Sequence, residues 1–148
     1  MSLNSQKQQL LDNLHNDIYT RLGVSKIQGI GVMAIRPIPK GIDPFKGPST
    51  CQNDHVIHLS EAEIADLHPR VKKLLKDFFF KNRDGHYGVH VQGLNEMDVS
   101  FYMNHSDEPN IELVSVPGCP FYEFRTSRRI KVGEELTFDY RGSNGLGH

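Results

Sequence analysis

The sequence predicts a single domain with a mainly β fold and some α-helix, on three observations. Short runs of strand-forming residues, at 32–35, 111–116, 121–125 and 136–140, alternate with turn residues after position 24. Prolines fall between these runs, which favours many short strands over a regular alternation of strands and helices. Two stretches with apolar residues at helical spacing account for the helices.

The first helical stretch covers residues 4–22. Leu10, Leu14 and Ile18 recur at helical spacing, and Gly23 suits a helix end. We therefore expect residues 1–23 to form a flanking helix that packs on the main domain. A contact between two copies in a homodimer is the alternative.

The second helical stretch runs from about 59 to 80. Ser60 followed by Glu63 is a capping-box signature, and Pro69 should kink or split the helix. The run Phe78-Phe79-Phe80 is expected in the core.

Length and charge exclude several classes. A chain of 148 residues is long enough for one core without metals or disulfides. The net charge of −1 creates no overall field toward nucleic acid, and no apolar run is long enough to span a membrane. We therefore expect neither direct nucleic-acid binding nor membrane insertion.

The two cysteines and the polar N-terminus favour an intracellular location. Residues 1–10 contain no signal-peptide core, and two cysteines suit a reducing compartment. No nuclear-localisation cluster is evident, so nucleus and cytoplasm are not distinguished. Cys51 and Cys119 cannot supply four zinc ligands, and the histidine pairs lack acidic or cysteine partners, so no metal site is predicted.

Polar and glycine residues gather in three segments: 27–32 with 38–41, 101–110, and 133–140. Each alone has a plain structural interpretation. The first has the glycines of a turn, the second is a polar turn, and the third places Leu136, Phe138 and Tyr140 on one side of a strand.

Together and in this order, the three segments resemble the SET-domain protein lysine methyltransferases. The resemblance covers about residues 25–141 and rests on Gly29-Ile30-Gly31-Val32, Asn104-His105-Ser106 with Pro109-Asn110, and Gly133-Glu134-Glu135-Leu136 with Asp139-Tyr140. It implies a β-clip-like SET fold of small curled sheets with a C-terminal pseudoknot. The SET domain would span 24–141 with a variable insert at about 52–99, and 142–148 would be a flexible tail.

The resemblance also implies a site. S-adenosyl-L-methionine would be the cofactor, with its amino group held by Asn104 and its adenine by His105. Tyr140 would be the catalytic residue. The backbone that cradles the methionine part would be Gly29, Ile30, Gly31 and Val32. The channel for the substrate lysine would be lined by Phe45, Tyr102, Phe138 and Tyr140.

The implied function is enzymatic: methyl transfer from S-adenosylmethionine to the side-chain amine of a protein lysine, with a histone tail as one candidate. The alternative is a SET-fold module that binds cofactor or peptide with little or no turnover. Phe138, two residues before Tyr140, implies that di- or trimethylation is permitted.

Three departures from the family pattern bear on this interpretation. Asp107 stands where a cysteine usually follows Asn-His-Ser, and Phe45 stands where the family often has tyrosine. No cysteine-rich segment follows Arg141. Another element must therefore close the lysine channel, and the candidates are the N-terminal helix, the tail or a second subunit.

Overall fold

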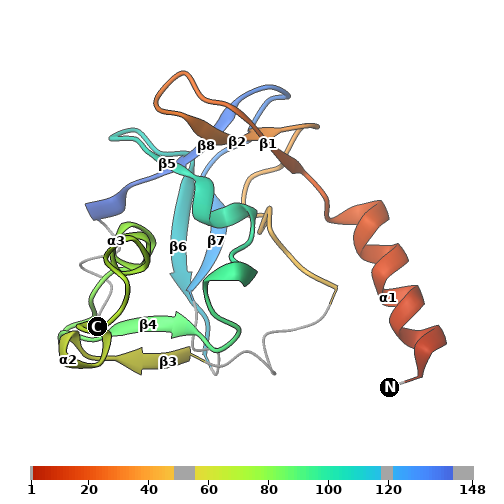
Figure 1. The fold of residues 1–148 in the computed structure, drawn as a ribbon. Coiled ribbons are helices and arrows are strands. Elements are labelled where there is room, and N and C mark those ends of the chain that lie inside the picture. Colours follow the sequence, from red (N-terminus) through yellow and green to blue (C-terminus); the bar gives the residue numbers. More distant parts are fainter. Residues whose placement is uncertain (1, 49–55, 118–121, 142–148) are drawn as a thin grey trace.

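The computed structural model describes residues 2–48, 56–117 and 122–141 (Figure 1). Its α-helices are α1 (Leu3–Asn16), α2 (Glu61–Ile64) and α3 (Pro69–Phe78), and its 3₁₀ helices are η2 (Leu94–Glu96) and η3 (Val99–Tyr102). Its strands are β1 (Thr20–Val24), β2 (Ile30–Ala34), β3 (Val56–Leu59), β4 (Tyr87–His90), β5 (Asn104–His105), β6 (Ile111–Ser115), β7 (Tyr122–Thr126) and β8 (Glu135–Phe138). Among the described residues, no helix has both the length and the apolar composition that a membrane span needs.

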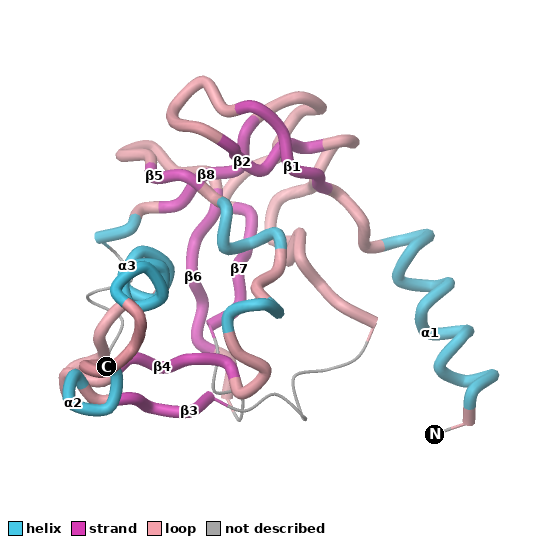
Figure 2. The backbone as a smooth tube through the Cα atoms, in the orientation of Figure 1, coloured by secondary structure: helices cyan, strands magenta, loops and turns pink. Residues whose placement is uncertain are grey.

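The strands form three small sheets, as the predicted fold class requires. One has the order β1-β2-β8-β5, and the others are the pairs β3-β4 and β6-β7. Most neighbours are antiparallel, but β5 and β8 are parallel, with Asn104 opposite Thr137 and His105 opposite Phe138. Figure 2 shows these two strands side by side at one edge of the four-stranded sheet. The central and closing segments of the sequence therefore meet there.

Two apolar clusters fill the interior. The larger lies under the four-stranded sheet and consists of Val32, Ala34, Ile38, Met103, Ile111, Ile130 and Leu136. The smaller joins the helical insert to the β3-β4 pair and consists of Ile64, Leu75, Phe79, Tyr87 and Val89. Each fully buried aliphatic side chain contributes about 1.5–3 kcal/mol to folding.

A buried asparagine fixes β8. The side-chain nitrogen of Asn110 donates to the backbone oxygen of Glu135 at 2.9 Å, and its side-chain oxygen accepts from the backbone nitrogen of Thr137 at 2.9 Å. Asn110 is 3% exposed, so both polar atoms need these partners. This clamp holds the strand that leads to Tyr140.

The N-terminal helix is shorter than the sequence predicts. It ends at Asn16, and Thr20–Val24 is instead strand β1, in register with β2 from Thr20↔Ala34 to Val24↔Ile30. Gly23 lies within this strand and does not end the helix. The prediction failed because Ile18 and Leu22 continue the helical spacing by coincidence, while pairing with β2 decides the conformation.

The leucine face of α1 does not pack on the main domain, contrary to expectation. Figure 1 shows α1 extending away from the sheets. The side-chain nitrogen of Asn13 donates to the backbone oxygen of Lys46 at 2.7 Å, and the Arg36 guanidinium donates to the backbone oxygen of Asn16 at 2.6 Å.

The helical insert follows its prediction closely. Ser60 and Glu63 form the capping box of α2, and Pro69 begins the separate helix α3. Phe79 is buried and Phe78 packs against the smaller cluster, but Phe80 is 37% exposed and lies outside the core. The expectation that all three phenylalanines are core residues is therefore wrong for Phe80.

Candidate active site

Asn104 lies at the centre of a cradle of hydrogen-bond acceptors. Its side-chain nitrogen is 3.0 Å from Oγ of Ser25, 3.1 Å from the backbone oxygen of Gln28 and 3.2 Å from that of Ile30. The same nitrogen is 2.9 Å from Oε2 of Glu135. An amide nitrogen carries two hydrogens, so four acceptors surround two donors. Acceptors that the Asn104 amide does not use can therefore bond to a cationic donor group.

Gly31 allows this cradle to form. It is buried, and a Cβ placed on it would lie 2.5 Å from Oε2 of Glu135 and 3.1 Å from Cβ of Ser25. Ser25 in turn donates through Oγ to the Glu135 carboxylate at 2.7 Å and accepts from the backbone nitrogen of Ile27 at 2.9 Å. Only glycine at position 31 leaves the carboxylate this close to the β2 backbone.

Tyr140 is held at both its backbone and its side chain. Its backbone nitrogen donates to Nδ1 of His105 at 3.1 Å, and its hydroxyl donates to the backbone oxygen of Met103. Since Nδ1 accepts this bond, the ring proton of neutral His105 lies on Nε2, which is 3.0 Å from Oδ1 of Asp107. Asp107, the residue that replaces the usual cysteine, therefore helps to orient His105.

Burial determines the ionisation of Tyr140. Loss of water around the phenol raises its pKa above the usual value, and the nearby negative charge of Glu135 raises it further. The hydroxyl therefore stays protonated at neutral pH. It can orient a ligand by hydrogen bonding, but it is not a base.

A row of aromatic rings leads away from Tyr140. The ring centroids are 4.8 Å apart from Tyr140 to Phe138, 5.9 Å from Phe138 to Phe124 and 5.6 Å from Phe124 to Phe45. On another side, Phe80 lies with its centroid 6.3 Å from the Tyr140 ring. These side chains give the surroundings of the Tyr140 hydroxyl a largely apolar character.

The structure brings together most, but not all, of the predicted site residues. The ring contact of Tyr102 is with Phe78, at 5.8 Å, and Tyr102 packs beside the larger core cluster. The Val32 side chain is fully buried in that cluster, so only its backbone can face a ligand. Gly29 has φ of +52° and sits in the exposed turn between β1 and β2.

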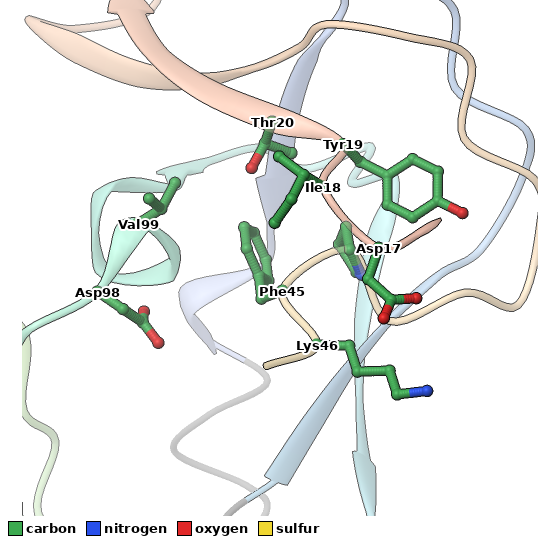
Figure 3. A pocket seen from close by; sticks show the side chains of 9 residues that line it. Asp17, Ile18, Tyr19, Thr20, Phe45, Lys46, Asp98 and Val99 are labelled. Carbon is green, nitrogen blue, oxygen red and sulfur yellow. The ribbon is translucent and has the colours of Figure 1, made fainter. Parts of the chain in front are cut away.

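A cavity of about 220 Å³ adjoins the far end of the aromatic row (Figure 3). It is lined by Asp17, Ile18, Tyr19, Thr20, Pro44, Phe45, Lys46, Asp98 and Val99. Phe45 is the only predicted site residue among these. None of the residues of the acceptor cradle lines the cavity, and the ring contacts of Phe45, Phe124 and Phe138 connect it to Tyr140.

A family model for the SET domain matches residues 29–141. The chain belongs to the SET-domain family. Members of this family are generally methyltransferases. This SET domain is also similar to a solved structure, a candidate histone methyltransferase from Plasmodium falciparum. The TM-score is 0.50 at 17% sequence identity, over 83% of this chain and 93% of that one. That likeness supports the fold, while a search of curated proteins finds no significant match.

Several residues of this SET domain's site were not predicted. Glu135 stands within a motif of the sequence, and strand alternation separates its side chain from the apolar face of Leu136. Ser25 carries no signal in the sequence beyond its place before a glycine-containing turn. Phe80 was assigned to the core with its neighbours. All three are positioned by contacts between segments distant in the sequence.

Of the three elements proposed to close the lysine channel, the structure places the N-terminal helix. α1 extends away from the sheets in Figure 1, and its hydrogen bonds to the rest of the domain involve Lys46 and Arg36. From the insert, Phe80, two residues after α3, lies with its ring centroid 6.3 Å from that of Tyr140. The predicted tail at 142–148 lies outside the described residues, as do Cys51 and Cys119. Within the described residues, no group of three or more metal-ligating side chains gathers.

Proposed function

We propose that this SET domain transfers a methyl group from S-adenosylmethionine to the side-chain amine of a protein lysine. The observation that carries the proposal is the acceptor cradle at Asn104, placed beside a half-buried, protonated tyrosine and a row of aromatic rings. Family membership supplies the reaction class, and the geometry supports the assignment of roles.

The residues present fit the methionine end of the cofactor. An α-ammonium group brings three donor hydrogens, and the backbone oxygens of Gln28 and Ile30 with the Glu135 carboxylate provide acceptors for them. Asn104 would hold the same group through its side-chain oxygen. S-adenosylmethionine supplies, when bound, a methyl group on a positively charged sulfur that a neutral amine can displace directly.

The aromatic row would prepare the substrate amine. A lysine with an ordinary pKa near 10.4 must lose about 3.4 pKa units, or roughly 4.6 kcal/mol, to be neutral at pH 7. Removal of water by Tyr140, Phe138 and Phe124 disfavours the ammonium form and lowers that cost. The Tyr140 hydroxyl, fixed on Met103, would then orient the neutral amine.

Histone tails are the first candidate substrates because the similar Plasmodium falciparum structure is described as a candidate histone methyltransferase of that organism. Phe138 lacks a hydroxyl that could hold a water molecule beside the amine, so we expect di- and trimethylated products.

A methyl-transfer assay tests this function. Purified protein is incubated with radiolabelled S-adenosylmethionine and an array of lysine-containing peptides, including histone tails. We expect label on lysine, and loss of most of it in Tyr140→Phe, with calorimetry showing that this variant still binds the cofactor. Cofactor binding without transfer would contradict enzymatic activity and support the binding module. Full activity in Tyr140→Phe would contradict the role given to that hydroxyl.

A further inference from the structure

The helix α1 presents an apolar stripe that nothing in the described structure covers. Leu10, Leu11 and Leu14 are 47%, 39% and 55% exposed. The domain contacts the helix beside this stripe, at the buried Asn13. An isolated helix of this length is marginal in water, so α1 needs a partner for its apolar face.

The charges on α1 argue against a membrane as that partner. Helices that lie on membranes carry many lysines or arginines on the polar face. Lys7 is the single lysine or arginine of α1, and Asp12 and the following Asp17 offset it. A protein surface is therefore the better candidate.

The stripe is complementary to the same stripe of a second α1 that runs in the opposite direction. Lys7, Leu10, Leu14 and Asp17 follow one another at steps of three, four and three residues. These steps keep the four residues on one face of the helix, with Asp17 at its C-cap. The spacing of these residues is the same from either end, with a lysine at one end and an aspartate at the other.

We propose that α1 pairs antiparallel with α1 of a second copy of this chain, across a two-fold axis near residue 12. Leu10 of each copy then packs against Leu14 of the other, as in an antiparallel coiled coil. Lys7 of each copy faces Asp17 of the other. Oδ2 of Asp17 accepts from the side-chain nitrogen of Asn13 at 3.3 Å, and Oδ1 accepts from the lysine, so two ion pairs close the ends and set the register. Lys7 has no ion-pair partner within the described part of a single chain.

The expected interface is small. A 14-residue helix is about 21 Å long, and a pair of such helices buries an area at the low end of specific interfaces, below about 1,200 Å². The dimer should therefore dissociate on dilution, and the measurement must cover a range of concentrations.

Sedimentation velocity of the full chain tests the pairing without any assay of activity. From about 1 µM to about 100 µM, a range that suits a small interface, we expect a monomer–dimer equilibrium. Lys7→Glu or Asp17→Lys alone places like charges opposite each other and should weaken the dimer about tenfold or more. The double variant Lys7→Glu/Asp17→Lys should restore most of the affinity.

Gln9→Glu is the matched control, because it adds a charge to α1 on the face away from the stripe and should leave the dimer unchanged. Circular dichroism of each variant verifies that α1 remains folded. A monomer across the whole concentration range would overturn the proposal. So would a dimer that neither single charge reversal weakens, or a double variant weaker than both single ones. None of these outcomes bears on methyl transfer, so this inference and the proposed function fail separately.

Discussion

The side-chain nitrogen of Asn104 and Oε2 of Glu135 are 2.9 Å apart, which joins the central and closing segments of the SET domain in one hydrogen bond. Residue 31 lies directly against this pair, since a Cβ there would come within 2.5 Å of the same Oε2. The acceptor cradle thus depends on three segments of the chain, which contain Gly31, Asn104 and Glu135. Each segment can be tested by its own substitution.

Gly31→Ala should weaken the binding of S-adenosylmethionine by about tenfold or more, or about 1.4 kcal/mol. The added methyl group displaces the Glu135 carboxylate and breaks its bonds to Ser25 and Asn104. Isothermal titration calorimetry measures the change. Gly47→Ala is the control, because a Cβ there meets nothing within 4 Å. Unchanged affinity in Gly31→Ala would show that the carboxylate position is irrelevant to the cofactor.

His105→Phe should lower kcat about tenfold, since each tenfold loss corresponds to about 1.4 kcal/mol of the barrier. Phenylalanine keeps the ring contact with Tyr140, at 5.3 Å, but cannot accept the hydrogen bond from its backbone nitrogen. His105→Asn should recover part of the rate, because its side-chain oxygen can take the position of Nδ1. If both variants are equally slow, the hydrogen bond is not what positions Tyr140.

Phe138→Tyr should restrict the product to monomethyllysine. The ring of residue 138 lies 4.8 Å from that of Tyr140, so an added hydroxyl can hold a water molecule in the space that a methylated amine needs. Mass spectrometry of a peptide at saturating cofactor distinguishes the products. The wild type should give di- and trimethyllysine, and an exclusively monomethylated product from the wild type would contradict the interpretation of Phe138.

Phe80→Ala should raise the KM for peptide several-fold, by an amount that corresponds to about 1 kcal/mol for one aromatic contact, and leave cofactor binding unchanged. Phe80 reaches Tyr140 from the end of α3 and is 37% exposed, so its loss opens the site to water without disturbing the core. Val91→Ala, another exposed apolar residue of the insert, is the control. If both variants raise the KM for peptide equally, Phe80 has no particular role in peptide binding.

Asp43→Asn should stabilise the protein slightly at pH 7. Burial raises the pKa of Asp43, and the nearby carboxylates of Glu123 and Asp98 add to the effect. Because the folded pKa is raised, the stability from this group is complete below the unfolded pKa and is lost as the pH rises through the folded pKa. Asparagine does not ionise, so the variant avoids this loss of stability. Its side-chain oxygen still accepts the hydrogen bond from the backbone nitrogen of Phe45.

The expected gain for Asp43→Asn is below about 1 kcal/mol, because solvent screens a half-exposed group. Urea unfolding at pH 7 and near pH 3 measures it, and the gain should vanish at the lower pH. A gain of the same size at both values would mean that ionisation of Asp43 is not the cause.

The family and the fold were predictable because they depend on local signals. The four strands predicted from periodicity correspond to β2, β6, β7 and β8, and the split at Pro69 followed from the missing backbone donor of proline. The strands β1, β3, β4 and β5 are short or lack alternation, and distant partners determine them. Leu22 illustrates this, since its spacing continues a helix while its pairing with Val32 makes a strand.

The sequence predicted which motif residues lie close together, but not the contacts that support them. Asn104, His105 and Tyr140 stand within recognisable segments. The contact of Glu135 with residue 31 and that of Phe80 with Tyr140 arise from the fold as a whole. The sequence alone contains no periodicity that links such distant positions.

The proposed role of the acceptor cradle at Asn104 is to bind the ammonium group of S-adenosylmethionine. Calorimetric titration with S-adenosylmethionine and with 5′-deoxy-5′-methylthioadenosine, which lacks the amino-acid part, tests it most directly. We predict that S-adenosylmethionine binds at least about tenfold more tightly, a difference of about 1.4 kcal/mol, and that Asn104→Ala removes most of this preference. Equal affinity for the two compounds, or a preference that Asn104→Ala leaves intact, would contradict this role of the cradle.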